Sequence, residues 1–200
     1  MLYEYGGLYA DCDIECLKPL EAGLTTNCVL NLEPDIHPLV VASYGKKHIV
    51  SNALMACEVR HPFFQYVIQG LTKPERFHHR NVLYSTGPIM LDDVYLEFNK
   101  SFTNPPQLVP SEIFQPIPDP RFFKQYRQYC KKLAHQNYTT REDSVLANKT
   151  CYPYLNNVQI KATNESLTVH KWVHSWIKDS FYQRSKRKTF NVSDLLHDPE

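Results

Sequence analysis

The stretch YEYGGLYADCDIECLKPL, residues 3–20, places two carboxylates, Asp11 and Asp13, two positions apart directly after an apolar run. Aspartate is a poor strand former and is rarely buried without a partner. On a strand, residues two apart face the same side, so these carboxylates would project together about 6–7 Å apart. That spacing suits one carboxylate on a metal ion and the other on a metal-bound water or a substrate hydroxyl. Oxygen ligands of this kind favour Mn²⁺ or Mg²⁺.

Two other interpretations of the acidic pair need weighing. A solvent-exposed acidic turn would give the same short pattern, and this interpretation stays open on spacing alone. A calcium loop of the D-x-[DN]-x-[DN]-G type does not fit, because Cys16 stands where the glycine is required and apolar residues follow.

The composition describes a globular protein of 200 residues, which suits one domain. Hydrophobic residues make up 42% and charged residues 22% of the chain. The formal net charge of +1 gives no overall attraction to nucleic acid or to an anionic membrane. No run approaches the ~18 apolar residues that indicate a membrane span. A nucleic-acid partner is therefore not expected.

Several features indicate a secretory compartment, although no signal peptide begins the chain. The N-x-Ser/Thr glycosylation pattern occurs at Asn99, Asn137, Asn148, Asn164 and Asn191. The six cysteines are an even number, which permits disulfides. Cys130 and Cys151 flank a polar segment and are the expected pair. The alternative is that all six are small buried apolar groups.

The pattern of apolar residues and breakers predicts strands alternating with helices, an α/β class. The expected strands cover 8–13, 29–32, 38–44 and 107–110. The expected helices cover 49–59 with Ser51 as N-cap, 63–71, the segment after the Gly-Pro turn within 85–98, and 120–134. Residues 1–5 are expected to form a last helical turn capped by glycine, and 136–166 a polar surface loop. The basic run 184–188 is expected to be a solvated tail, or else a membrane-surface patch.

The residues around the acidic pair resemble the signature of glycosyltransferases that carry the DXD sugar-binding motif. The family pattern Tyr-Gly-Gly-aliphatic-Tyr-x-Asp-x-Asp, then Leu-x-Pro-Leu, is matched here by Tyr5, Gly6, Gly7, Leu8, Tyr9, Asp11, Asp13, Leu17, Pro19 and Leu20. Three later segments follow in the family's order: SNALMACEVRHPF (51–63), STGPIML (85–91) and VHKWVHSW (169–176). In the last, His174 replaces the usual glycine. The resemblance covers roughly residues 1–180 and points to eukaryotic Golgi hexosyltransferases, including inositol phosphoceramide mannosyltransferases.

The resemblance implies a GT-A-like, Rossmann-related domain over residues 1–183, with a basic and polar tail at 184–200. It also implies that this chain lacks the strands of the nucleotide-binding half and the membrane-associating segment of the full-length enzyme. We therefore expect the full-length form to be a membrane-anchored enzyme of the Golgi lumen. The chain expressed alone is expected to fold poorly and to lack activity.

Enzymes of this family move a hexose from a nucleotide-diphosphate sugar, here GDP-mannose or a UDP-hexose, to a hydroxyl of a glycolipid or glycan, with retention at the anomeric carbon. Mn²⁺ or Mg²⁺ would neutralise the charge of the departing diphosphate. By the resemblance, Asp13 and Ser175 would hold the metal and Asp11 would contact donor hydroxyls. His170 would lie near the diphosphate and Trp176 against the donor. The alternative is that His170 and Trp176 are structural residues of the core.

Four further residues are candidates for contact with the sugar or for the reaction. Asn52 would lie near the transferred sugar, where an amide can bridge two hydroxyls. Gly87 would let the backbone approach a ligand, or would simply make a turn. Asp92 and Asp93 are the only candidates for a carboxylate nucleophile, unless they stabilise a helix N-terminus. A front-face mechanism, with the leaving phosphate as base, would need no such residue.

Two rival functions come from other classes. One is a catalytically inactive relative of the family that binds sugars or acts as a scaffold. The other is a metal-dependent phosphoesterase, which would need a denser cluster of histidine and aspartate than this sequence shows.

Overall fold

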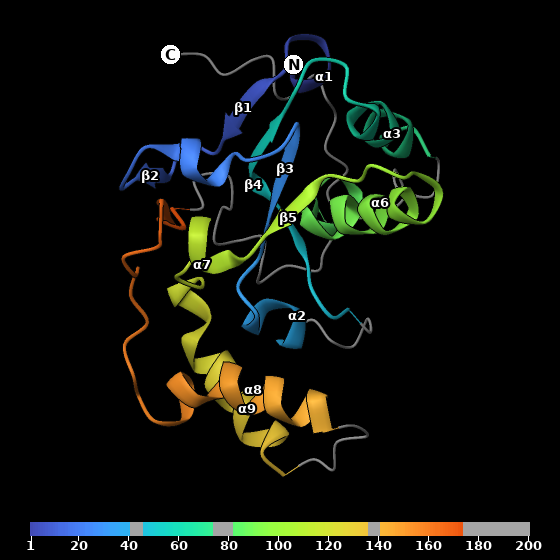
Figure 1. Ribbon diagram of the computed structural model, residues 1–200. Helices are drawn as coiled ribbons and strands as arrows, with labels where there is room; N and C mark the ends of the chain where they lie inside the picture. Colours follow the sequence, from blue (N-terminus) through green and yellow to red (C-terminus); the bar gives the residue numbers. More distant parts are fainter. Residues whose placement is uncertain (41–45, 74–81, 136–140, 174–200) are drawn as a thin grey trace, which may run out of the picture.

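A computed structural model describes residues 1–40, 46–73, 82–135 and 141–173. Within these residues the central sheet has four strands in the order β1–β4–β3–β5 (Figure 1). Their bounds are β1 Gly7–Ala10, β3 Cys28–Leu32, β4 Val50–Cys57 and β5 Gln107–Val109. β4 runs antiparallel to β1 and β3, and β3 runs parallel to β5. The chain therefore leaves β1, β3 and β5 at the same edge of the sheet.

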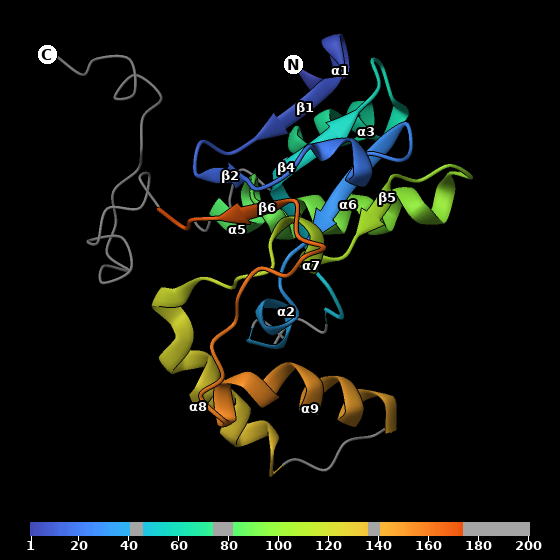
Figure 2. The ribbon, with the colours of Figure 1, turned by 60° about the vertical axis from the view of Figure 1, so that its left-hand side comes forward.

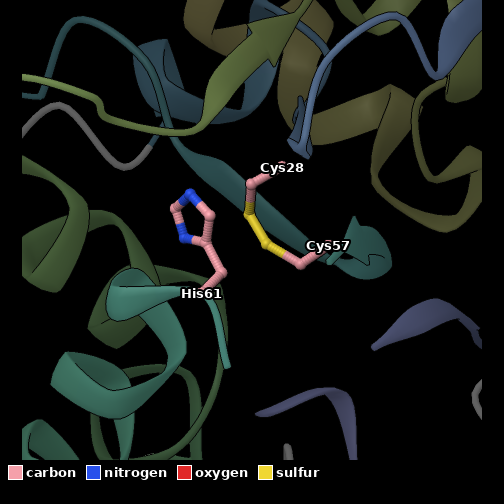
Figure 3. A group of neighbouring side chains, drawn as sticks. All are labelled: Cys28, Cys57 and His61. Carbon is pink, nitrogen blue, oxygen red and sulfur yellow. A yellow bond between two sulfur atoms is a disulfide. The ribbon is translucent and has the colours of Figure 1, made fainter. Parts of the chain in front are cut away.

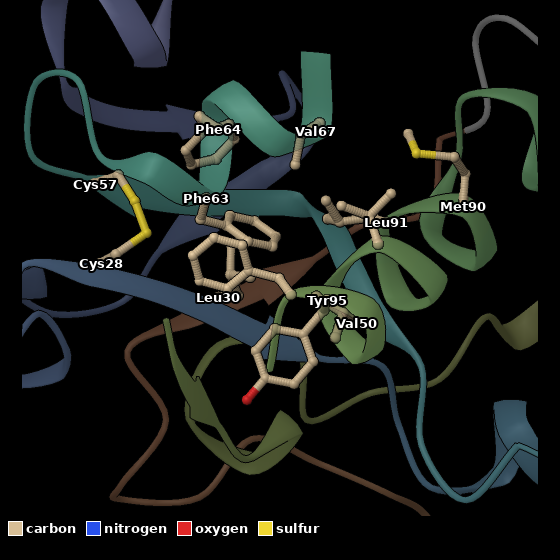
Figure 4. Packing of buried hydrophobic residues seen from close by; sticks show 12 residues of the cluster. Cys28, Leu30, Val50, Cys57, Phe63, Phe64, Val67, Met90, Leu91 and Tyr95 are labelled. Atoms are coloured by element: carbon tan, nitrogen blue, oxygen red, sulfur yellow. A yellow bond between two sulfur atoms is a disulfide. The ribbon is translucent and has the colours of Figure 1, made fainter. Parts of the chain in front are cut away.

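Two helices, α3 (Pro62–Leu71) and α6 (Pro88–Ser101), pack on the sheet and form the largest buried cluster (Figure 4). Phe63 and Phe98 are almost fully buried, with ring centroids 5.4 Å apart in an edge-to-face arrangement. Burial of aromatic side chains of this size dominates the energy of a core. The predicted helices over 63–71 and within 85–98 are confirmed, as are the strands over 29–32 and 107–110. The mixed sheet with its helices fits the predicted α/β class.

A helical hairpin forms a second part of the structure, below the sheet in Figures 1 and 2. It consists of α8 (Phe123–Leu133) and α9 (Arg141–Leu155), which pack against α2 (Ile36–Val40). A disulfide joins Cys130 to Cys151. This confirms the predicted cysteine pair.

The structure corrects three predicted elements. Residues 49–59 are not a helix, because β4 lies between two strands and is buried along most of its length. A strand buried on both faces loses the alternation of apolar and polar residues, so its pattern resembles that of a helix. The predicted strand over 38–44 begins inside α2, and its part from 41 lies outside the described residues. The polar segment 136–166 contains α9, whose Ala147, Cys151 and Tyr154 are buried at helical spacing.

The remaining elements are short, and β2 and β6 lie near the acidic stretch (Figure 2). The short elements are α1 Leu2–Tyr5, β2 Ile14–Cys16, η1 Leu20–Gly23, α5 Val82–Ser85, α7 Ser111–Phe114, η3 Pro120–Phe122 and β6 Thr168–His170. Gly6 ends α1 with a φ of 63°, and a Cβ there would lie 2.6 Å from the Val59 nitrogen, so glycine is required. This confirms the predicted glycine cap. In the described part of the chain, no helix combines the length and the apolar character needed to cross a bilayer.

Candidate functional site

The chain turns sharply after β1, and this turn carries both acids. The Asp11 N–H donates to the Ala53 carbonyl at 2.8 Å, and the Ile14 N–H donates back to the Asp11 carbonyl at 3.0 Å. The predicted strand over 8–13 therefore ends at Ala10, and the two acids do not share a strand face. In the turn, carboxylate oxygens of Asp11 and Asp13 come within 4.8 Å of each other. This is closer than the separation expected from a strand.

A two-stranded antiparallel ribbon brings the C-terminal part of the described chain to this turn. β2 pairs with β6 so that Ile14 lies opposite His170. Beyond this pair, the Lys171 N–H donates to the Asp13 carbonyl at 2.9 Å. The Val173 N–H donates to Asp13 Oδ2 at 2.8 Å. The acidic turn and the segment around His170 therefore contact each other, and their common role in donor binding stays a prediction.

Asp11, Asp13 and His170 form a cluster whose possible ligand atoms all lie within 4.8 Å of one another. His170 Nε2 lies 3.2 Å from Asp13 Oδ1. The Tyr9 hydroxyl donates to Asp11 Oδ1 at 2.6 Å, which raises the pKa of Tyr9 to about 12, helped by burial and the nearby negative charges. Two carboxylates and one imidazole are a donor set that suits Mn²⁺ or another divalent cation with preference for oxygen and nitrogen. The residues present therefore fit the expected metal.

Two side chains, Gln115 and Trp172, position the imidazole of His170. Gln115, which is fully buried, places its Nε2 3.2 Å from His170 Nδ1. The Trp172 ring lies against the imidazole with centroids 4.0 Å apart, and its Nε1–H donates to the Ile117 carbonyl at 2.8 Å. If the Gln115 amide donates to Nδ1, the His170 proton resides on Nε2 and points at Asp13. A 180° turn of the amide would let Oε1 accept from Nδ1–H and would leave Nε2 free to bind a cation.

A buried Glu–His pair lies beside this site at the end of β3. Glu33 Oε2 and His37 Nδ1 are 2.7 Å apart. Burial alone would raise the pKa of Glu33, but hydrogen bonds from His37 and Ser51 and the charge of His37 outweigh it and hold this pKa below its usual range. The His37 ring packs edge-on against Trp172 with centroids 5.3 Å apart. The pair therefore supports the same tryptophan that covers His170.

The other predicted donor residues have separate outcomes. Ser175, Trp176 and the neighbouring His174 lie outside the described residues. Asn52 is half-buried in β4, next to Ala53, whose carbonyl receives the Asp11 N–H. Its neighbour in the chain therefore contacts the acidic turn, and the contact of Asn52 with a sugar stays a prediction.

Gly87 is the N-cap of α6, with an ordinary φ of −93°. A Cβ at this position would lie 2.8 Å from the Leu83 Cα and 2.9 Å from the Val82 carbonyl oxygen. The close packing of α5 on α6 thus explains the glycine without a ligand. Its role in donor binding stays a prediction.

Asp92 and Asp93 both form ion pairs with Lys46. Lys46 Nζ lies 2.6 Å from a carboxylate oxygen of each, and the Val50 N–H donates to Asp92 Oδ1 at 3.1 Å. Burial alone would lower the pKa of Lys46, but its hydrogen bonds to both aspartates outweigh this and raise it. The fully buried Asp92 therefore ties the start of β4 to α6.

A second cluster of possible metal ligands consists of Cys28, Cys57 and His61 (Figure 3). The two cysteines lie directly opposite each other on β3 and β4, and a disulfide joins them. His61 Nδ1 accepts the Phe63 N–H at 3.2 Å and so caps α3. Because the sulfur atoms are bonded to each other, this cluster is a covalent crosslink. The sequence analysis did not predict this pair.

The sequence analysis also missed Gln115, Trp172 and the Glu33–His37 pair. Trp172 stands two residues after His170 in VHKWVHSW, and this proximity could have suggested a shared site. Gln115 and Glu33 carry no local signal, because each has a partner far away in the sequence, His170 for Gln115 and Ser51 for Glu33.

Comparison with known proteins finds three relatives, all inositol phosphoceramide mannosyltransferases of Schizosaccharomyces pombe. Number 2 is 28% identical over 109 residues, which are 53% of this chain and 28% of the relative. Number 1 is 29% identical over 120 residues, which are 57% of this chain and 33% of the relative. Number 3 is 28% identical over 103 residues, which are 50% of this chain and 26% of the relative. The chain thus matches only about a quarter to a third of the length of these relatives. No model of a protein family matches the chain. This weak similarity supports a glycosyltransferase-like protein.

Proposed function

We propose that the chain is the catalytic part of a metal-dependent glycosyltransferase with a GT-A-like fold. It would move a hexose from GDP-mannose or a UDP-hexose to a hydroxyl of a glycolipid or glycan, with retention. The observation that carries the proposal is the cluster of Asp11, Asp13 and His170. It lies beyond the end of β1, at the edge where β3 and β5 also end. Open α/β sheets bind ligands at the carboxyl ends of their parallel strands.

In this proposal Asp13 and His170 would hold Mn²⁺ or Mg²⁺, and Asp11 would accept from a donor hydroxyl. The cation, when bound, would supply Lewis-acid stabilisation for the departing diphosphate. The chain's own groups keep the ligands in place: Tyr9 donates to Asp11, and the Val173 N–H donates to Asp13. These contacts reduce the motion that the ligands must lose when the cation binds.

The other donor contacts belong to the proposal as well. Ser175 would add a hydroxyl ligand to the metal, and Trp176 would pack on the donor. Asn52 would bind the transferred sugar, and Gly87 would lie near the donor. A front-face mechanism accounts for retention without a carboxylate nucleophile, and the ion pairs of Asp92 and Asp93 with Lys46 favour it.

A Golgi location is supported by features of a secreted protein. The structure contains two disulfides in its described part, and such bonds persist in oxidising compartments. The acceptor asparagines Asn99, Asn148 and Asn164 are exposed, as glycosylation requires.

The test offers GDP-mannose and UDP-hexoses, with Mn²⁺, to glycolipid and glycan acceptors and analyses the products. For the full-length form of the enzyme we expect hexose transfer that is lost with EDTA and in Asp13→Asn. Donor binding without transfer or hydrolysis would instead identify an inactive sugar-binding relative. The absence of both binding and turnover would contradict the proposal.

A further inference from the structure

The solvent-facing side of α9 carries apolar side chains around a glycosylation pattern. Ala147, Cys151 and Tyr154 are buried toward α8. On the opposite side, Val145 and Tyr152 are each 59% exposed. An amphipathic helix normally turns side chains of this size inward. The outer face of α9 therefore offers apolar surface to a covering group.

Asn148 lies between these two side chains on the same face. It stands three residues after Val145 and four before Tyr152, and residues at these spacings are neighbours on a helix. Helix side chains lean toward the helix N-terminus, so Tyr152 leans over the turn that contains Asn148. Asn148 Nδ2 lies 3.5 Å from Ser144 Oγ. That contact uses one of the two Nδ2 hydrogens, so the nitrogen can carry a substituent.

The groups that a glycan needs are free of other contacts. Asn148, Lys149 and Thr150 form an N-x-Thr acceptor pattern, and Asn148 is exposed. The Tyr152 side chain makes no hydrogen bond and no ring contact with any residue that the structure describes. A sugar can therefore cover the Tyr152 ring without breaking a contact within the protein.

We propose that Asn148 carries an N-linked glycan whose first N-acetylglucosamine units pack on the Tyr152 ring and cover Val145. The C–H groups of a pyranose form an apolar face that matches the face of an aromatic ring. The glycan adds a contact on the outer side of α9, whose inner side is joined to α8 by the disulfide between Cys130 and Cys151. This inference rests on the proposed passage through the secretory pathway and is independent of glycosyl transfer.

Asn164 is a matched control site in the same chain. It also begins an N-x-Ser pattern and is exposed. It precedes β6 in a segment without helix or strand, and no large apolar side chain within four residues of it is exposed. A glycan at Asn164 therefore has no apolar strip to cover.

The experiment expresses the full-length form in insect cells and maps its glycans by mass spectrometry. Release of the glycans by peptide:N-glycosidase in H₂¹⁸O marks each occupied asparagine. Asn148→Gln removes the acceptor. Thr150→Val removes the pattern in a second way and breaks no hydrogen bond, because the buried Thr150 Oγ1 has no partner among the described residues. Asn164→Gln is the control, and hydrogen exchange of α9 measures how firmly the helix is held.

We expect a glycan on Asn148, and α9 amides that exchange roughly two- to tenfold faster in Asn148→Gln and in Thr150→Val. Asn164→Gln should leave the exchange of α9 unchanged. In a Tyr152→Ala background, which keeps the acceptor pattern, loss of the Asn148 glycan should have no further effect.

A glycan on Asn164 with none on Asn148 would overturn the inference and leave the proposed location intact. The absence of glycan from every acceptor site would overturn both. Equal exchange of α9 with and without the Asn148 glycan would also overturn the inference, as would an equal effect of its loss in the Tyr152→Ala background. Because no donor sugar or Mn²⁺ enters these measurements, their outcome is separate from that of the transfer assay.

Discussion

In the part of the chain that the structure describes, two clusters each bring three possible metal ligands within 4.8 Å of one another, and they differ in location and bonding. The first, Asp11, Asp13 and His170, lies in a turn and a two-stranded ribbon at the edge of the central sheet. The second, Cys28, Cys57 and His61, lies inside the main core (Figures 3 and 4). Proximity alone does not distinguish them.

The difference lies in what each ligand atom is already bonded to. In the core cluster the sulfurs are joined to each other, and His61 Nδ1 accepts from the first turn of α3. In the edge cluster the carboxylates are only partly buried and accept a few hydrogen bonds, so they keep lone pairs for a cation. The core cluster therefore serves stability, and we assign ligand binding to the edge cluster.

The largest expected effect follows from removing the core crosslink. The Cys28→Ala, Cys57→Ala double variant should lose about 3–4 kcal/mol of unfolding free energy, because the bond closes a loop with a sequence separation of 29. Urea denaturation measures the loss. Mn²⁺ affinity of the folded variant should equal that of the wild-type chain. A variant that stays as stable but binds Mn²⁺ more weakly would reverse the assignment of the two clusters.

A smaller effect is expected when the support of the edge cluster is removed. Gln115→Met keeps the length of the side chain but takes away the hydrogen bond to His170 Nδ1. Mn²⁺ affinity should fall about tenfold, which is typical for the loss of a residue that orients a metal-ligating histidine. Isothermal titration calorimetry measures the affinity, and ¹⁵N chemical shifts of His170 report which ring nitrogen carries the proton.

Gln128→Met is the matched control, because it makes the same chemical change at an exposed residue of α8. It should leave both readouts unchanged. If Gln115→Met and Gln128→Met bind Mn²⁺ alike and leave the His170 proton on the same nitrogen, then Gln115 does not position the imidazole.

The smallest effect concerns His61 and pH. Burial lowers the pKa of His61 in the folded chain. The unfolded chain, in which histidine titrates near 6.5, therefore binds protons more readily, and stability should fall as the pH drops from 7 through this value. His61→Asn keeps an acceptor for the Phe63 N–H and removes the titration. Its urea midpoint should change less between pH 7 and pH 5, and an unchanged pH dependence would argue against a buried neutral His61.

Elements with strong local signals were predicted correctly from the sequence. Pro62 and the aromatic run after it define α3, and the glycine at position 6 ends α1 because only glycine tolerates that backbone. β4 was mistaken for a helix, because a central strand buried on both faces has no alternating pattern. The helix α9 was not predicted, because its segment is mostly polar. Its buried residues can be recognised as one face of a helix only when α8 is known to pack against them.

The candidate site was predicted in part. The acidic pair was identified from its spacing and from the resemblance, whereas His170 was identified from the resemblance alone. The separation of 157 positions between Asp13 and His170 gives no local clue to their contact. The predicted strand geometry of the pair was wrong, because the turn is set by a hydrogen bond to Ala53 on a distant strand. Gln115 and Glu33 were not identifiable, because the sequence alone does not distinguish a buried polar residue from an exposed one.

The central claim is that Asp11, Asp13 and His170 bind a divalent cation, and a Mn²⁺ titration followed by electron paramagnetic resonance tests it most directly. The concentration of free Mn²⁺ is measured while Mn²⁺ is added to the wild-type chain, to Asp13→Asn, or to the control Glu165→Gln, whose substitution is at an exposed residue. We predict one bound Mn²⁺ for the wild-type chain and for Glu165→Gln, and at least a tenfold weaker affinity for Asp13→Asn, which is about 1.4 kcal/mol. Equal affinity of Asp13→Asn and the wild-type chain, or no binding by either, would contradict the account.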